Sequence, residues 1–342
     1  MFINNFMTLS RHKRPVEKTL WLLTAAPYLL CLMAGTPSTG VAQNQAFPTK
    51  PVRMVTTEPG SGSDFVTRLI AQELTSLWGQ QVIVDNRGGA SGAIASELVA
   101  RSTPDGYTLI LYGNPMWLLP LFRKNVPYDP VKDFAPITLA VSSPDIVVVH
   151  PAVAVKSVAD LIALAKAKPG ELNYVSSATG GSTHVAAELF KSMAKVNLVR
   201  VTYRGVGAAV TALMGAQGQV MFAAPAAVLP HIKSGRLRAI AVTSAEPSAL
   251  APGLPTVAST GIPGYESIII FGAFAPAKIP NGLVAKLHQD MVRALSKTEI
   301  KEKFFNAGME VVGSTPSALA VKVNAEMDSL RKVIKETGIR ED

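Results

Sequence analysis

One loop of alternating glycine and serine joins an apolar stretch to a stretch with helical periodicity. It reads TTEPGSGSDF and runs from Thr56 to Phe65. The start of a helix leaves about four N–H groups without internal partners and carries a partial positive charge. Gly60 and Gly62 allow an anion to approach that backbone closely. Ser61 and Ser63 add hydroxyl donors. The loop therefore favours an anion site, although Gly-Ser loops also form ordinary turns. 

A second loop repeats this arrangement within NYVSSATGGSTHVAAELF. A β-like run, Asn173 to Ser176, precedes it, and apolar residues at helical spacing follow it. In a two-lobed α/β protein, sites lie outside the carboxyl ends of strands, so one such loop per lobe is expected to face a shared cleft. The candidate ligand-binding residues of this loop are Ser177, Thr179, Gly180, Gly181, Ser182 and Thr183.

Three neighbouring features have structural interpretations beside functional ones. His184 either borders the ligand or lies on the surface of the helix start. Asp64 is expected to be the N-cap of the helix that begins at Phe65. The glycine-rich stretch from Asn86 to Glu97 is interpreted mainly as a tight turn and a helix start.

The residue types and spacings required by several enzyme classes are missing. Phe65 stands where a dinucleotide-binding fingerprint needs its third glycine, and no lysine follows the loop as a P-loop requires. The chain has no Gly-x-Ser-x-Gly motif, and its five histidines are isolated, without metal-ligand spacing. These observations favour a binding protein without a catalytic centre, cofactor or metal.

Alternating strand and helix patterns must position the two loops. Ten β-rich stretches indicate strands, separated by helical stretches such as SVADLIALAKAK, which opens with the capping pair Ser157 and Asp160. The ten are VRMVTT, QVIVDN, YTLILYG, ITLAV, IVVVH, LNYVSS, LVRVTY, VMFAA, LRAIAVTS and IIIFGAFAP. Two or three helices are expected after the last strand. The chain is 48% apolar over 342 residues, so we expect two α/β lobes with ample core.

The first 42 residues resemble an export signal. A segment with four basic residues precedes an uncharged apolar run, Thr19 to Gly35, and Gly40-Val41-Ala42 supplies small residues for cleavage after Ala42. The alternative is an uncleaved anchor. Cleavage would remove Cys31, the only cysteine, and lower the formal net charge from +9 to +6. The remaining basic residues are scattered and lack interleaved aromatics, which argues against a nucleic-acid partner.

Several blocks of the chain, in order, resemble the Bug family. These include KPVRMVTTEPGSGSDFVTRLIAQEL, GQQVIVDNRGGASGAIASELVA, SSATGGSTHVAAELFK and VTYRGVGAAVTALMGAQGQVMF. Bug proteins are extracytoplasmic solute-binding receptors of tripartite tricarboxylate transporters. The resemblance implies a type II periplasmic-binding-protein fold, with one lobe from residues 47–142 and 268–342 and the other from 143–267. It also implies a periplasmic, monomeric receptor that closes over a small organic acid and delivers it to integral-membrane transporter subunits.

Two departures from the family pattern bear on the ligand. Thr57-Glu58 replaces the usual Phe-Ala, and Ala223 stands where the family often has Asp. Glu58 either faces the ligand or forms a salt bridge outside the cleft; if it faces the cleft, we expect a mono- or dicarboxylate rather than citrate. Tyr203 and Arg204 match the family's Tyr-Lys position, where Arg204 either binds a carboxylate or caps the strand. The alternative functions are an enzyme that uses the same cleft and a ligand-sensing partner of a signalling receptor.

Overall fold

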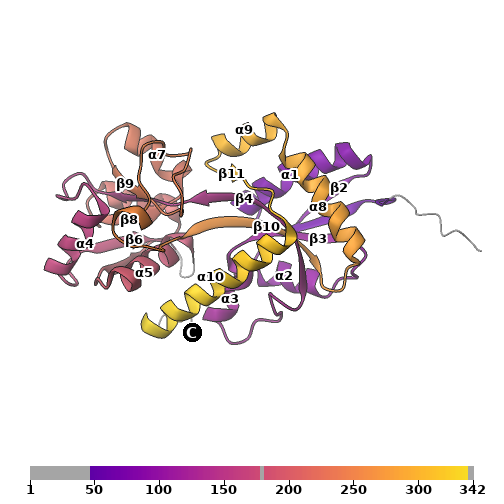
Figure 1. Ribbon diagram of the computed structural model, residues 1–342, viewed down its shortest axis with the longest axis horizontal. Helices are drawn as coiled ribbons and strands as arrows, with labels where there is room; N and C mark the ends of the chain where they lie inside the picture. The colour runs from indigo at the N-terminus through magenta and orange to yellow at the C-terminus, as the bar shows by residue number, and fades with distance from the viewer. Residues whose placement is uncertain (1–46, 178–180, 338–342) are drawn as a thin grey trace, which may run out of the picture. The chain divides into compact units, whose positions relative to one another are not determined.

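The computed structural model describes residues 47–177 and 181–337. The predicted signal peptide, residues 1–42, lies outside them, and so do Thr179 and Gly180. Figure 1 shows two lobes, each built on its own sheet, with the long strands β4 and β10 running toward the boundary between them. The chain is an α/β protein, as predicted.

The first sheet has six strands in the order β11-β4-β10-β3-β1-β2. β1 is parallel to β2 and β3, whereas β10 is antiparallel to β3 and β4. The strands are β1 (Val52–Thr56), β2 (Val82–Asn86), β3 (Thr108–Gly113), β4 (Phe134–Pro144), β10 (Ile268–Pro276) and β11 (Glu310–Val311). A strand from the C-terminal part of the chain, β10, therefore lies in the middle of this sheet, and β11 forms one of its edges.

Helices cover both faces of this sheet because successive side chains of a strand point to opposite faces. Val52 and Met54 pack in one core with residues of α1 and α8, whereas Val55 packs in the other with residues of α2, α3 and α10. The helices are α1 (Gly62–Trp78), α2 (Ala93–Ala100), α3 (Pro115–Phe122), α8 (Asn281–Leu295), α9 (Thr298–Asn306) and α10 (Pro316–Thr337), with the short η1 (Ala90–Gly92) before α2.

The second sheet has five strands in the order β7-β6-β8-β5-β9. β6 is parallel to β7 and β8, and β5 is antiparallel to β8 and β9. Its strands are β5 (Ile146–Val149), β6 (Asn173–Ser176), β7 (Val199–Thr202), β8 (Val220–Ala223) and β9 (Arg238–Val242). Its helices are α4 (Val158–Ala167), α5 (Ser182–Ala194), α6 (Val206–Met214), α7 (Pro225–Lys233) and the short η2 (Ala258–Thr260).

The strand predictions are confirmed, since each of the ten β-rich stretches contains a strand. The capping pair before α4 is also confirmed, because the Ser157 side chain accepts from the Asp160 N–H. The three C-terminal helices are α8, α9 and α10. The predicted lobe limits, 47–142 with 268–342 and 143–267, remain a proposal.

The chain passes from the first sheet to the second at Asp145, between β4 and β5. The Asp145 N–H donates to Thr243 Oγ1 over 2.7 Å, and the Thr243 carbonyl accepts from Ser267 N–H, on the segment that returns to the first sheet. Thr243 is therefore hydrogen-bonded to both segments that connect the two sheets, the one at Asp145 and the one at Ser267. The Asp145 side chain is fully buried, and within the described part of the chain neither carboxyl oxygen has a hydrogen-bond partner.

Candidate ligand-binding site

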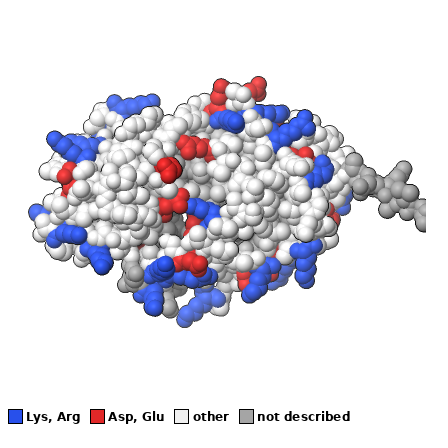
Figure 2. Space-filling model, in the orientation of Figure 1, with Lys and Arg blue, Asp and Glu red and all other residues white. Residues whose placement is uncertain are grey.

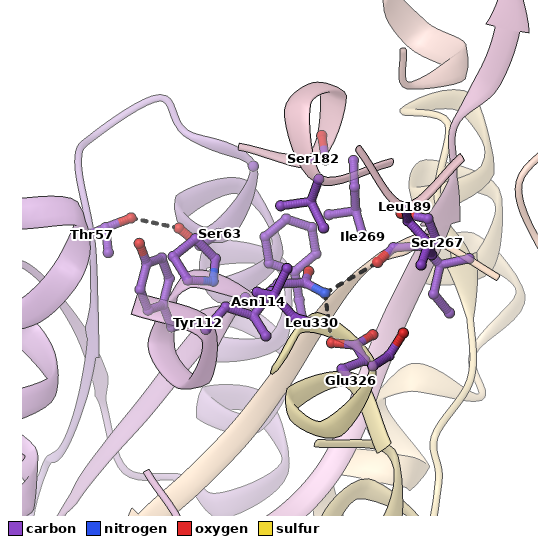
Figure 3. Close-up of a pocket in the computed structure, with 18 of the residues that line it drawn as sticks. Thr57, Ser63, Tyr112, Asn114, Ser182, Leu189, Ser267, Ile269, Glu326 and Leu330 are labelled. Carbon is purple, nitrogen blue, oxygen red and sulfur yellow. Dashed lines mark hydrogen bonds between the residues drawn. The ribbon is translucent and has the colours of Figure 1, made fainter. Parts of the chain in front are cut away.

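A cavity of about 330 Å³ lies between the two lobes, beside the start of α1 (Figure 3). Most of its walls come from the first lobe, including α10, and Ser182, Val185 and Leu189 come from α5 of the second. The lining residues of the first sheet and its loops are Thr57, Glu58, Ser61, Gly62, Ser63, Tyr112, Gly113, Asn114, Pro115, Leu118, Ser267, Ile268, Ile269 and Phe271. Glu266 and the α10 residues Glu326, Ser329, Leu330 and Val333 complete the walls.

Three hydroxyl groups meet where α1 begins. Thr57 Oγ1 lies 2.7 Å from Ser63 Oγ, and Ser61 Oγ lies 3.0 Å from Ser63 Oγ. The three groups carry three hydrogens and these two bonds use two of them, so one hydrogen, shared only in a longer Thr57–Ser61 contact of 3.4 Å, can turn toward an acceptor. Within the described residues, no hydrogen bond occupies the N–H groups of Gly62 and Ser63, the first two residues of the helix. This end of the cavity therefore offers donors and the positive end of a helix dipole to an anion.

The prediction that Asp64 is the N-cap is wrong. Ser61 is the N-cap, because its side chain accepts from the Asp64 N–H, and the helix begins at Gly62 instead of Phe65. Asp64 instead accepts from the N–H of Gly60, whose φ of 76° suits a residue without a side chain. Burial alone would raise the pKa of Asp64, but hydrogen bonds from Arg68, Asn86 and Gly60 lower it. Asp64 thus fixes the loop and is not among the residues that line the cavity.

Glu58 lines the same end of the cavity. Its Oε1 accepts from the Gly89 N–H over 2.8 Å, and this bond lowers the pKa of Glu58. The glycine-rich stretch from Asn86 to Glu97 is confirmed as a turn and helix start, and through Gly89 it also positions this carboxylate. Burial, and then the nearby charge of Glu58, raise the pKa of Tyr112, whose hydroxyl donates to the Ser91 carbonyl.

The second loop contributes Ser182 to the cavity wall. Gly181 is the N-cap of α5, and the Ser177 N–H donates to Thr183 Oγ1 in the first turn of that helix over 3.0 Å. Thr183 is buried. Arg200, which the sequence analysis did not single out, supports the loop by donating to Ser176 Oγ and the Ser177 carbonyl.

The surface interpretation of His184 is wrong, because its side chain is only 2% exposed. Burial, followed by the charge of Arg200, lowers the pKa of His184 to about 4. The ring is therefore neutral at physiological pH and supplies no positive charge to a carboxylate there. His184 is not among the residues that line the cavity, so its contact with a ligand stays a prediction.

Three residues inferred from the family resemblance lie outside the cavity lining. The Tyr203 hydroxyl bonds to Gln217, Arg204 is exposed after β7, and Ala223 is buried at the end of β8 opposite Ile146. Gly60, Ser177, Gly181 and Thr183 are also not among the lining residues. A role in binding stays a prediction for all of these residues.

The sequence analysis missed residues that reach the cavity from elsewhere in the chain. Asn114 follows β3, Phe271 lies in β10, and Glu326 lies in α10. Asn114 carried a usable signal, because a polar residue directly after a buried strand is well placed for a site at the strand's carboxyl end. No comparable signal marks Phe271 or Glu326. Strand pairing brings β10, with Phe271, to the cavity, and helix packing brings α10, with Glu326.

Figure 2 shows several acidic side chains along the middle of one face, whereas most Lys and Arg side chains lie toward its edges. The Lys and Arg side chains drawn on this face form no dense basic patch. Within residues 47–177 and 181–337, no group of three or more His, Cys, Asp or Glu side chains is placed to hold a metal ion. No helix of that part of the chain is long and apolar enough to cross a membrane.

The sequence matches one protein family over most of its length. The profile of a family described as the tripartite tricarboxylate transporter family receptor matches residues 66–339. Protein BugT of Bordetella pertussis is 31% identical over 297 residues, which are 86% of this chain and 91% of BugT.

Two solved structures support the same relationship. R. palustris Rpa4515 with adipate is 34% identical with a TM-score of 0.72, and the match covers 86% of this chain and 99% of that one. MatC (Rpa3494) from Rhodopseudomonas palustris with bound malate is 27% identical with a TM-score of 0.67, and the match covers 84% of this chain and 100% of that one. Both structures share the two-lobed fold.

Proposed function

Because this chain belongs to the tripartite tricarboxylate transporter receptor family, which includes the Bug proteins, we propose that it captures a small carboxylate for a membrane transporter. The family consists of periplasmic substrate-binding receptors. The chain itself would be exported, cleaved after Ala42 and active as a monomer without catalysis. The observation that carries the proposal is the start of α1, where two N–H groups without a partner among the described residues and three hydroxyl groups belong to residues that line the cavity.

A carboxylate fits this end of the cavity for physical reasons. Its oxygens would accept hydrogen bonds from the N–H groups of Gly62 and Ser63 and from one hydroxyl of the cluster, and its charge would interact favourably with the helix dipole. Ser182 of α5 faces the same cavity from the other lobe, so a bound acid would contact both lobes. The adipate and malate of the two relatives, both dicarboxylates, support a small acid with two carboxylates.

A thermal-shift panel tests this function. We expect C4 to C6 mono- and dicarboxylates to raise the melting temperature, because a ligand at 100 times its dissociation constant adds about 2.7 kcal/mol to the free energy of unfolding. Neutral sugars of similar size should leave it unchanged. Stabilisation by sugars without stabilisation by acids would contradict the proposal.

The Glu58 carboxylate should disfavour ligands with a third carboxylate. We expect Glu58→Gln to raise the affinity for citrate relative to the best dicarboxylate about fivefold to tenfold, since removing one nearby repulsion is worth ~1 kcal/mol. The amide oxygen preserves an acceptor for the Gly89 N–H. Calorimetric titration of both ligands gives the ratio. Glu246→Gln, at an exposed glutamate outside the cavity lining, is the control. An equal ratio in wild type and Glu58→Gln would mean that Glu58 does not select the ligand.

Export predicts a defined mature N-terminus. We expect the protein recovered from the periplasmic fraction of a Gram-negative host to begin at or near Gln43, because small residues precede it. N-terminal sequencing or intact mass measures this. A membrane-bound product that retains Met1 would contradict cleavage.

A further inference from the structure

The end of the cavity away from the α1 start is acidic. In Figure 3, Thr57 and Ser63 lie at one side of the cavity, and Glu326 and Ser267 lie at the other. Of the three glutamates that line the cavity, Glu326 and its neighbour Glu266 lie at this end, whereas Glu58 lies at the start of α1; no Lys or Arg is among the lining residues. A ligand that fills the cavity therefore presents one end to backbone N–H groups and the other to a carboxylate.

Glu326 is held in place on one of its two oxygens. Its Oε2 accepts from Trp117 Nε1 over 2.8 Å and from Asn114 Nδ2 over 2.9 Å. Asn114 is itself fixed between the Ile268 carbonyl and the Ile270 N–H of β10. Among residues 47–177 and 181–337, no hydrogen bond reaches Glu326 Oε1. The carboxylate is thus oriented by the protein and keeps one oxygen for a donor in the cavity.

Lys322, whose positive charge acts on Glu326, is paired with another carboxylate. Lys322 Nζ lies 2.6 Å from Glu266 Oε2 and is not among the lining residues. Glu326 forms no ion pair within the described part of the chain. Burial raises the pKa of Glu326 to about 7, against the lowering effects of Trp117, Lys322 and Asn114. A ligand cation at Oε1 would supply the missing countercharge.

The walls between the two ends are largely apolar. They are formed by Leu118, Leu189, Ile269, Phe271 and Leu330. Such walls favour methylene groups over hydroxyl groups, since a buried hydroxyl without a partner costs free energy. The cavity therefore suits a short hydrocarbon chain with a different polar group at each end.

We propose that Glu326 selects a zwitterionic ligand, an ω-amino carboxylic acid whose carboxylate binds at the start of α1 and whose ammonium group binds Glu326 Oε1. This inference rests on the proposed function and narrows its substrate class. Glu326 is the specificity-determining residue, and Asn114 and Trp117 position its carboxylate. Glu266 lies at the same end of the cavity and is paired with Lys322, so Glu326 is the carboxylate left for the ammonium group.

Matched ligands of equal length test the proposal. For each chain of four, five and six carbons, calorimetry compares the ω-amino acid, the dicarboxylate and the monocarboxylate; the six-carbon set is 6-aminohexanoate, adipate and hexanoate. At pH 8 we expect the best ω-amino acid to bind at least tenfold more tightly than the dicarboxylate of the same length. The dicarboxylate places a second negative charge against Glu326, whereas the ammonium group is attracted to it.

The Glu326→Gln variant separates charge from packing, because its amide oxygen still accepts from Trp117 and Asn114. We expect it to lose at least tenfold in affinity for the ω-amino acid and to gain affinity for the dicarboxylate. Asp328→Asn, on the same helix but outside the cavity lining, should change neither. A thermal melt of each variant confirms folding.

The pH dependence gives an independent readout. Between pH 6 and pH 8 Glu326 loses its proton, so the affinity of the wild type for the ω-amino acid should rise, and this rise should disappear in Glu326→Gln. Lys322 and Glu266, the charged groups facing Glu326, remain in both proteins. If adipate or another dicarboxylate binds as tightly as its amino counterpart, or if Glu326→Gln leaves the ratio unchanged, the inference is wrong and the proposed function stands. If no acid of any kind binds, the proposed function fails.

Discussion

The Gly62→Val substitution is expected to weaken carboxylate binding more than 100-fold, or about 2.8 kcal/mol. A Cβ atom at Gly62 would lie 3.0 Å from Cζ of Phe271, which itself lines the cavity. The two further methyl groups of valine must therefore push Phe271 into the cavity or move the first turn of α1. Either shift displaces the N–H groups of Gly62 and Ser63 from the ligand. Calorimetric titration with the best acid measures the loss.

Gly282→Val is the matched control, because Gly282 lies in the first turn of α8 and a Cβ there meets nothing within 4 Å. This control should keep wild-type affinity, and both variants should unfold cooperatively. If Gly62→Val binds like the wild type, the start of α1 is an ordinary turn and is not the anion site.

Asp145→Asn is expected to stabilise the protein at pH 8 and to have little effect near pH 4. Burial raises the pKa of Asp145 from 3.8 to about 7. Because the folded state holds the proton more tightly than the unfolded state, the carboxyl group destabilises the fold increasingly as pH rises from 3.8 to 7, and fully above that. Each unit of pKa shift corresponds to about 1.4 kcal/mol, so the gain at pH 8 should amount to several kcal/mol.

Thermal melts of wild type and Asp145→Asn at pH 4, 6 and 8 measure this effect. The difference in melting temperature should grow with pH, by about 2–4 °C for each kcal/mol. Other titrating groups, including Glu326, are common to both proteins and largely cancel in the difference. An increment that is equal at all three pH values would show that the pKa of Asp145 in the folded state is not raised above its value in the unfolded chain. Asp145 lies where the chain passes from one sheet to the other. The movement of the two lobes relative to each other is therefore a second quantity to measure in this variant.

The secondary structure was largely predictable because β-branched runs and helical periodicity act locally. Val66, Ile70 and Leu74 recur at helical spacing, and all three are buried on one side of α1. The helix start was less predictable, since Ser61 and Asp64 are both good capping residues and the choice depends on tertiary partners. Asn86 and Arg68 bind the Asp64 carboxylate, which leaves Ser61 to cap.

The candidate site was predictable only where one continuous loop builds it. The α1 loop contributes Thr57, Glu58, Ser61, Gly62 and Ser63 to the cavity, all of them site residues expected from the sequence. Asn114, Phe271 and Glu326 come from three distant elements, and only the antiparallel return of β10 and the packing of α10 bring them to that loop. The sequence alone therefore pointed to the anion end of the cavity and left the acidic end unrecognised.

The central claim is that the cavity takes up a small carboxylate and returns it unchanged. The most direct measurement incubates purified mature protein with an excess of its tightest-binding acid, removes free ligand, denatures the complex and quantifies the released molecule by mass spectrometry and NMR. We predict one equivalent of the intact acid per chain from the wild type and much less from Gly62→Val. Release of a chemically altered product, or equal amounts of acid from both proteins, would contradict the account.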